Sequence, residues 1–160
     1  MAERVHYDLW HGYRRLQRRG EPAAYPFGFG LSYCRWTLAE AKGTIGRGAD
    51  GQQGPVELSA LLRNGGEMEA AEVVQVYLEP PGLLMERPRR TLVAFQRVSL
   101  GAGEQRRLAL TIPLRRLACF DPSRDGFVLE GGPHRFVLAR HADDSGLVVD
   151  LVLEACELGP

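Results

Sequence analysis

The sequence predicts an all-β protein, an antiparallel β-sandwich with an N-terminal connector segment. From residue 34 onward, short segments in which apolar and polar residues alternate are separated by turns rich in glycine and proline. The same region has no sustained apolar repeat of 3.6 residues, which would indicate a helix. The length of 160 residues corresponds to about one domain, and a single sandwich would use nearly all of it.

Alternation along the candidate strands predicts which side chains face the core. Every second residue from Val56 to Leu62 is apolar, and neighbouring residues of a strand point to opposite faces. The same pattern runs from Val74 to Leu78, and Trp36, at the start of a strand, is expected in the core. The candidate strands are residues 35–41, 56–63, 72–79, 91–100, 105–112, 126–129, 134–140 and 147–153. Seven or eight short strands are typical of sandwiches of the immunoglobulin or fibronectin type III shape.

The turns between these strands have recognisable compositions. Three of them are typical of hairpins: RNGGE at 63–67, GAGE at 101–104 and EGGPH at 130–134. The proline-rich stretch EPPGLLMERPRR at 79–90 is expected to be a longer crossover and not a tight turn.

The chain is expected to divide near residue 33, into an N-terminal segment (residues 1–33) and the sandwich (residues 34–160). Val5, Leu9, Tyr13 and Leu16 have the spacing of one helical face, and an extended conformation of residues 8–13 is equally open. The stretch AYPFGFGLSY at 24–33, called the connector below, is too apolar for a free linker and too rich in glycine for a helix. We therefore expect it to be ordered and pressed onto a surface.

Charge and cysteine content exclude several classes of function. Basic and acidic side chains number 20 each, which argues against nucleic acid or an anionic membrane as a partner. No run approaches the roughly 20 apolar residues that a membrane helix needs. Cys34, Cys119 and Cys156 form no CxxC pair and are expected to be buried free thiols. The first 16 residues lack the apolar region of a secretory signal, so the cytoplasm is expected if Met1 is the true start.

No group of residues has the spacing of a known catalytic or metal site. Gly46, Gly48 and Gly51 match GxGxxG, but Gly54 and Pro55 break any helix that would bind a phosphate there. Histidines at 6, 11, 134 and 141 do not fall at metal-ligand spacing. Neighbouring carboxylates lie at predicted turns or strand edges, where solvation is expected: Asp121 and Asp125, Asp143 and Asp144, and Glu67, Glu69 and Glu72. We therefore expect no catalytic residue, no metal and no cofactor in this chain.

Aromatic side chains gather in the N-terminal segment, which has no predicted strand partner. Left exposed, they would form a large apolar patch, and such patches usually mark an interaction surface. Docking on another protein domain is the favoured interpretation, and docking on this sandwich or binding of a ligand are the alternatives. The aromatic residues are Trp10, Tyr13, Tyr25, Phe27 and Phe29.

An ordered set of motifs covers almost the whole chain. GYR at 12–14 is followed by YPFGFGLSY at 25–33 and AEVVQVYLEP at 71–80. The pattern P-x-x-x-L-x-x-F-x-x-V-x-L then runs from 88 to 100, ahead of LACFD at 117–121 and FVLEGG at 127–132. Together these motifs resemble the C-terminal region of glycoside hydrolase family 3, mainly β-glucosidases. There, the first two lead from an α/β-sandwich catalytic domain into a fibronectin type III-like domain. Cys34 and Arg35 depart from the pattern, at positions where threonines are common.

The resemblance implies an accessory role, because the family's nucleophile lies in an N-terminal (β/α)₈ barrel and its acid/base residue usually lies in the following α/β domain. No catalytic residue carries over, and residues 1–24 resemble the end of the second domain. The chain would be the C-terminal structural or docking domain of a bacterial β-glucosidase-like enzyme. Hydrolysis of terminal β-glycosidic bonds would reside in catalytic domains, in cis or as a separate fragment. Docking on them would involve Trp10, Tyr13, Arg14, Tyr25, Phe27 and Phe29. The alternative is a free-standing sandwich that binds carbohydrate, such as an oligosaccharide, or protein.

Overall fold

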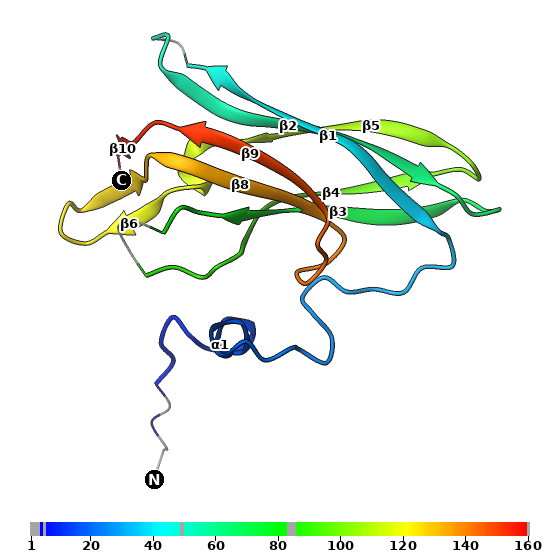
Figure 1. The fold of residues 1–160 in the computed structure, drawn as a ribbon, viewed down its shortest axis with the longest axis horizontal. Coiled ribbons are helices and arrows are strands. Elements are labelled where there is room, and N and C mark those ends of the chain that lie inside the picture. Colours follow the sequence, from blue (N-terminus) through cyan, green and yellow to red (C-terminus); the bar gives the residue numbers. More distant parts are fainter. Residues whose placement is uncertain (1–3, 5, 49, 83–85, 160) are drawn as a thin grey trace.

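The protein is a β-sandwich of two antiparallel sheets, with a third, small sheet at one end (Figure 1). The structure is a computed structural model that describes residues 4, 6–48, 50–82 and 86–159. One sheet has the order β1-β2-β5, and the other has the order β4-β3-β8-β9. The small sheet has the order β10-β7-β6. This arrangement confirms the predicted fold class.

The strands agree closely with the sequence pattern. Four predicted ranges, 91–100, 105–112, 126–129 and 147–153, coincide with observed strands. The first strand runs on to Arg47, well beyond the predicted end at residue 41, because it continues into a long hairpin with its neighbour. The strands are β1 (Trp36–Arg47), β2 (Gln53–Asn64), β3 (Ala70–Glu79), β4 (Thr91–Leu100), β5 (Gln105–Ile112), β6 (Cys119–Asp121), β7 (Gly126–Leu129), β8 (Gly132–Ala139), β9 (Leu147–Leu153) and β10 (Cys156–Leu158). The sequence did not predict β6 and β10, since three residues are too few to show alternation.

The core lies between the two large sheets and is formed by the side chains that alternation placed there. Val56 to Leu62 on β2 present every second side chain to it, and all four are buried. Val74 to Leu78 on β3 do the same, and Phe136 of β8 is fully buried among them. Trp36 is also buried in this core, as predicted, with its indole N–H donating to Ser32 Oγ at 2.9 Å.

Three turns predicted as hairpins instead carry the chain from one sheet to another, so that prediction was wrong. Residues 63–67 join β2 to β3, 101–104 join β4 to β5, and 130–134 join β7 to β8. Glycine permits the reversal of the chain but does not decide whether the flanking strands then pair. The side-chain amide of Asn64 donates to the carbonyl oxygen of Leu100 at 3.0 Å and so links the ends of two strands from opposite sheets.

The proline-rich stretch 79–90 also differs from its prediction as a crossover. It connects β3 and β4, which are neighbours in the same sheet, although it is long, as expected. Residues 83–85 within it lie outside the described part of the chain. Proline lacks the backbone N–H that a tight hairpin turn would use, and this explains why the connection is long. It does not decide whether the connection joins neighbouring strands or crosses to the other sheet.

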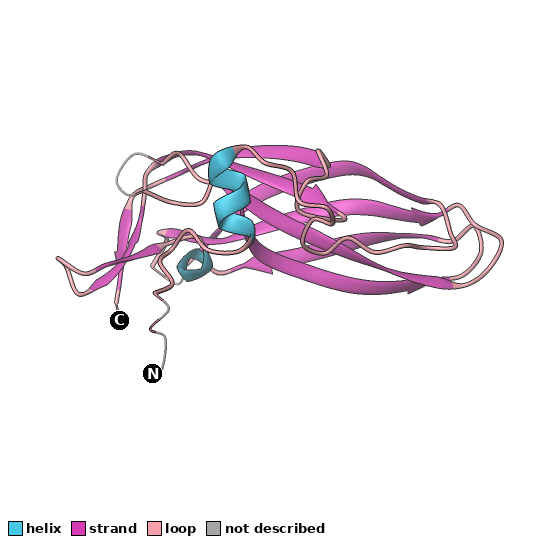
Figure 2. Ribbon diagram, turned by 90° about the horizontal axis from the view of Figure 1, so that it is seen from below, coloured by secondary structure: helices cyan, strands magenta, loops and turns pink. Residues whose placement is uncertain are grey.

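Residues 13–27 of the N-terminal segment cross the outer face of the four-stranded sheet (Figure 2). Its helix, α1 (Tyr13–Arg19), begins only at Tyr13. Leu9 lies outside this helix, so Leu9, Tyr13 and Leu16 do not form one helical face. Val5 lies outside the described residues. No residue of α1 is buried, and four of its seven residues are arginine. A second short helix, η1 (Leu114–Arg116), follows β5. None of the helices in the described chain has the length and apolar content required to cross a membrane.

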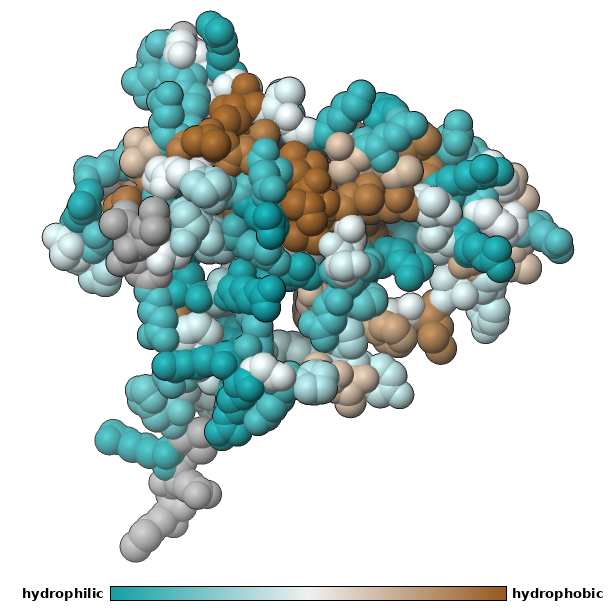
Figure 3. All heavy atoms as spheres, viewed as in Figure 1, coloured by the Kyte–Doolittle hydropathy of each residue, from teal (hydrophilic) through white to brown (hydrophobic). Residues whose placement is uncertain are grey.

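The side of the sandwich along β1 and β9 is incompletely closed. Leu38 and Ile45 of β1 and Leu147, Val149 and Leu151 of β9 pack against the core but stay partly exposed. Figure 3 shows apolar residues along the sandwich where these strands lie in Figure 1. Both strands are sheet edges, so each pairs with one neighbour only.

Candidate docking surface

The connector exposes most of its large apolar side chains. Tyr25, Phe27 and Phe29 are exposed, and the exposed fractions of Leu31 and Tyr33 reach 94% and 101%. The rings of Tyr25 and Phe29 lie together with centroids 5.8 Å apart. A folded protein normally covers side chains of this size, because each contributes about 1.5–3 kcal/mol when it is buried. The connector therefore forms an apolar surface that this chain by itself leaves open to solvent.

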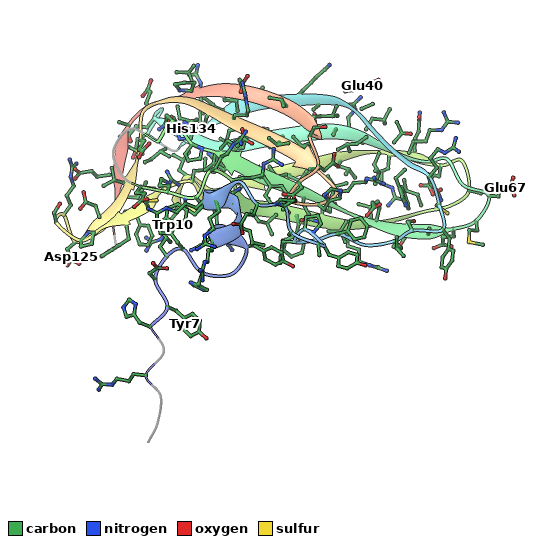
Figure 4. The ribbon with its side chains drawn as sticks, turned by 60° about the horizontal axis from the view of Figure 1, so that its bottom comes forward. Tyr7, Trp10, Glu40, Glu67, Asp125 and His134 are labelled. Carbon is green, nitrogen blue, oxygen red and sulfur yellow. The ribbon has the colours of Figure 1, made fainter. Side chains whose placement is uncertain are left out.

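The other predicted docking residues are divided between two places. The ring of Tyr13, at the start of α1, lies edge-on to Phe27 at 6.2 Å, so helix and connector meet there. Arg14 lines the same cavity as these two rings. Trp10 lies apart, beside α1 (Figure 4): its ring is 4.7 Å from the guanidinium of Arg18, and it lines a different hollow. The structure thus brings Tyr13, Arg14 and Phe27 together and leaves Trp10 separate.

Beneath the connector, the outer face of the four-stranded sheet has its own small apolar cluster. Tyr77 of β3 and Val137 and Ala139 of β8 are buried there, with Leu92 and Ala142 packed against them. A cavity of about 390 Å³ lies between this face and α1, and Tyr13, Phe27, Tyr77 and Arg90 are among the residues that line it. The end of β3 is consequently buried on both faces.

The backbone of the connector is hydrogen-bonded to this face of the sheet. The N–H of Ala142 donates to the carbonyl oxygen of Phe27 at 2.9 Å. The side-chain amide of Gln75 donates to the carbonyl oxygens of Arg140 at 2.6 Å and of Gly28 at 3.4 Å. The hydroxyl of Tyr77 donates to Oε1 of Gln75 at 2.5 Å. The connector therefore has one side attached to the sandwich and the other side exposed.

Gln75, Tyr77 and Arg90 were not identified from the sequence as site residues. On an alternating strand, Gln75 and Tyr77 fall opposite Val74, Val76 and Leu78, and a polar residue on that face predicts contact with water. Their signal would have been a tyrosine and a glutamine side by side on a face that an apolar connector could cover.

The electrostatics of this face keep Tyr77 protonated. Burial raises the pKa of the Tyr77 hydroxyl to about 12, while the positive charge of Arg90 acts in the opposite direction. The hydroxyl is therefore a hydrogen-bond donor at neutral pH. Arg90 itself is paired with Glu79 at 2.8 Å, and both side chains are largely buried.

Two of the carboxylates considered from the sequence, Asp121 and Asp144, have structural roles. Oδ1 of Asp121 accepts hydrogen bonds from the N–H and the hydroxyl of Ser123 within a turn. Asp144 accepts from the N–H groups of Arg140 and Gly146; burial raises the pKa of its carboxyl, but these bonds outweigh that effect and the pKa is lowered. Within the described ranges, no three His, Cys, Asp or Glu residues lie close enough together to bind a metal ion.

The remaining motifs also belong to the scaffold. Gly46 lies in β1, and Gly48 and Gly51 lie in the turn that leads to β2, so the GxGxxG match precedes a strand and not a helix. Of the three cysteines, which are free, Cys34 is buried as predicted, whereas Cys119 and Cys156 are only partly buried.

Comparison with known proteins connects this architecture with one enzyme family. The model of the fibronectin type III-like domain matches residues 72–142. A β-glucosidase of Rhizobium radiobacter is 35% identical over 138 residues, which are 85% of this chain and 16% of that protein. The structure of β-glucosidase 3B from Thermotoga neapolitana, in complex with glucose, superposes with a TM-score of 0.84 at 28% identity, over 96% of this chain and 21% of that one. The GH3 β-glucosidase of Bifidobacterium adolescentis gives a TM-score of 0.83 at 27% identity, over 91% and 21% of the two chains.

The chain is therefore a β-sandwich of the fibronectin type III-like class. More particularly, over most of its own length it matches the C-terminal part of glycoside hydrolase family 3 β-glucosidases, as an accessory domain, which confirms the resemblance found in the motifs. It spans only about a sixth to a fifth of the length of the relatives it matches. The rest of each relative has no counterpart in this chain.

Proposed function

We propose that this chain is a docking domain that packs on the catalytic domains of a β-glucosidase-like enzyme. Residues 1–33 would be the end of the preceding domain and the connector, and residues 34–160 the sandwich. Hydrolysis of terminal β-glycosidic bonds would take place in the catalytic domains, with this chain supplying no reacting group. The relatives, which are about five to six times as long, are named β-glucosidases, and this supports the proposal.

The observation that carries the proposal is the two-sided connector. Its backbone is hydrogen-bonded to Gln75 and Ala142, while Tyr25 and Tyr33 are mostly exposed to solvent. Phe29 lies with one edge against His141, at a centroid distance of 5.6 Å, and is still 43% exposed. A loop that only had to cover the sandwich would turn these rings inward. Ordered backbone beneath exposed aromatic rings is what a prearranged contact surface requires, because little conformational entropy is then lost on binding.

A binding experiment with a matched relative tests this function. The Rhizobium radiobacter β-glucosidase would be prepared without the region that aligns with this chain, and this chain would be titrated into it by calorimetry. The region deleted from the relative, added back as a separate fragment, serves as the positive control. We expect this chain to bind and to raise the hydrolysis of p-nitrophenyl β-glucoside, and we expect no hydrolysis by this chain alone.

Substitution of the exposed rings locates the contact. Phe29→Ser together with Tyr25→Ser should weaken binding at least about tenfold, because two apolar side chains of the surface are lost. Phe95→Ser, which removes an exposed ring of β4 outside the N-terminal segment, should leave binding unchanged. If the deleted fragment binds and this chain does not, the docking function is wrong. Retardation on glucan affinity gels would then support the carbohydrate-binding alternative.

A further inference from the structure

The outer face of β3 presents three polar side chains in succession to the connector side of the sheet. Gln75, Tyr77 and Glu79 alternate with the core residues of the strand, and Gln75 and Tyr77 are nearly inaccessible to solvent, with exposed fractions of 4% and 3%. Buried polar groups are costly unless they are hydrogen-bonded. Here all of the side-chain polar groups of Gln75 have partners.

The partners of Gln75 define the orientation of its amide. Both of its N–H groups point to carbonyl oxygens, those of Gly28 and Arg140, and its Oε1 accepts from Tyr77. In the reverse orientation Oε1 would face these two carbonyl oxygens, which can only accept, so both of those bonds would be lost. One side chain of β3 therefore connects the connector with the turn between β8 and β9, at residues 140–146.

Arg90 holds the same turn from the other side. It donates to the carbonyl oxygen of Ala142 at 2.6 Å and to that of Asp144 at 2.9 Å, and it is paired with Glu79. The N–H of Ala142 donates in turn to the carbonyl oxygen of Phe27. The turn is thus hydrogen-bonded both to Arg90 and to the connector. A displacement of the turn at one of these contacts would therefore also move the other.

Gly28 allows the connector to come this close. Its φ is +79°, and a Cβ atom at this position would lie 2.3 Å from Nε2 and 2.4 Å from Oε1 of Gln75. No other residue type would fit without moving either the connector or the Gln75 amide. Gly30, two residues further on, has open space around it and no positive φ.

We propose that Gln75, Tyr77 and Arg90 are positioning residues that hold the connector and the β8–β9 turn together on the outer face of the sheet. They set the direction in which the exposed rings of Tyr25 and Phe29 face a partner. The second statement rests on the docking function proposed above, and the first does not. None of these three side chains belongs to the core between the two large sheets.

Gly28→Ala tests the proposal in the intact 160-residue chain by hydrogen exchange. The added methyl group should push the connector away from Gln75, so the Ala142 N–H loses its acceptor and exchanges about tenfold faster or more. Amides in the middle of β2 and β3 should exchange as in the unchanged protein. A rise in exchange throughout the sandwich would contradict the proposal, since it would mean that Gly28 supports the fold as a whole.

Two matched variants separate the contact from the backbone strain. Gly30→Ala adds a methyl group in the connector with neither strain nor contact, and Gly20→Ala adds one at a φ of +68° with nothing within 4 Å. Neither should change the exchange of Ala142. If either variant accelerates it as much as Gly28→Ala does, or if Gly28→Ala has no effect, the proposed contact is overturned.

Tyr77→Phe removes one donor and keeps the ring. We expect faster exchange at Ala142 together with docking at least about threefold weaker in the calorimetric titration. Phe95→Tyr, which changes one hydroxyl group on an exposed ring of β4 outside the N-terminal segment, is the control and should change neither measurement. Unchanged docking alongside faster exchange would overturn the statement about the direction of the rings. Failure of the unchanged chain to bind would instead refute the docking function, and the exchange experiment would still decide the contact.

Discussion

His134 shows how one residue links burial with pH. Its side chain is fully buried in the sandwich on β8 (Figure 4); Nδ1 lies 3.0 Å from the carbonyl oxygen of Gly132, and Nε2 has no hydrogen-bond partner. The pKa of this imidazole is lowered, and burial is the largest cause. The hydrogen bond to Gly132 and the charge of Glu130 act in the opposite direction, while the positive charge of Arg87 lowers the pKa further. The folded state therefore contains the neutral ring.

The lowered pKa of His134 predicts a loss of stability in mild acid. Below the ordinary pKa of about 6.5, the unfolded chain binds a proton at His134 that the folded chain does not. The contribution of the neutral ring is complete above that pH and is lost as the pH falls towards the folded-state pKa. Urea unfolding of the unchanged protein and of His134→Leu, at about pH 7.5 and 5, measures the difference. The variant should lose less stability between the two pH values.

His6→Ala is the control for this comparison, because His6 is exposed. It should show the same dependence on pH as the unchanged protein. An equal loss of stability in His134→Leu would mean that carboxylates, and not this histidine, cause the sensitivity to acid.

At the scale of elements, the β1–β2 hairpin depends on a close approach of its two strands. Gly54 is buried in β2, and a Cβ atom there would lie 2.7 Å from the carbonyl carbon of Arg47 and 2.9 Å from that of Gly46. Backbone atoms cannot yield as the end of a flexible side chain can. The hairpin is therefore specific for glycine at this position, although the residue lies within a strand.

Gly54→Ala should destabilise this hairpin. We expect the free energy of unfolding to fall by about 1–3 kcal/mol, the usual cost of overpacking, with the largest change in hydrogen exchange at β1 and β2. Gly48→Ala is the matched control: its nearest atom would lie at 3.6 Å, an ordinary contact, and its stability should change by less than about 0.5 kcal/mol. Equal denaturation midpoints for the two variants would show that the strands separate at little cost.

The turns show what local sequence does and does not determine. Residues 63–67, 101–104 and 130–134 were predicted to be hairpin turns, yet each joins strands of different sheets. Glycine allows the backbone to turn, but pairing depends on which apolar faces meet. Strands that do pair can lie far apart in the sequence, as β2 and β5 do.

At the scale of the whole molecule, the isolated chain exposes an apolar surface along its connector. Leu31 and Tyr33 are almost completely exposed next to Phe29, while the polar helix α1 occupies the neighbouring surface. Exposed apolar patches of this kind promote association. The surface proposed above to dock on catalytic domains would therefore bind a second copy when the chain is alone and concentrated.

Sedimentation velocity measures this tendency. The sedimentation coefficient of the unchanged chain should rise with concentration into the range of hundreds of micromolar, as expected for roughly millimolar to micromolar affinities of small apolar contacts. Phe29→Ser with Leu31→Ser should remove most of the rise, and Val152→Ser, at an exposed position of β9, should not. A rise that persists in the first variant and disappears in the second would place the contact at the sheet edge.

The site was only partly predictable from the sequence. The aromatic residues of the connector stand out in the composition of one short stretch, so their clustering needed no knowledge of the fold. Gln75 and Arg90 did not stand out, since a glutamine on β3 and an arginine before β4 have the pattern of solvent-exposed residues. Only the passage of the connector over the sheet made them buried partners of Gly28 and Ala142.

Alternation of apolar residues over a few positions was sufficient to locate most of the strands, the core faces of β2 and β3, and the buried position of Trp36, because side-chain direction along a strand is a local property. The ordered motifs likewise determined the family. The assignment of strands to sheets, the burial of both faces of β3 and the contact between Gln75 and Gly28 were decided by the tertiary structure alone. Each of these brings together segments dozens of residues apart, and their apposition follows from the burial of the molecule's apolar surface as a whole.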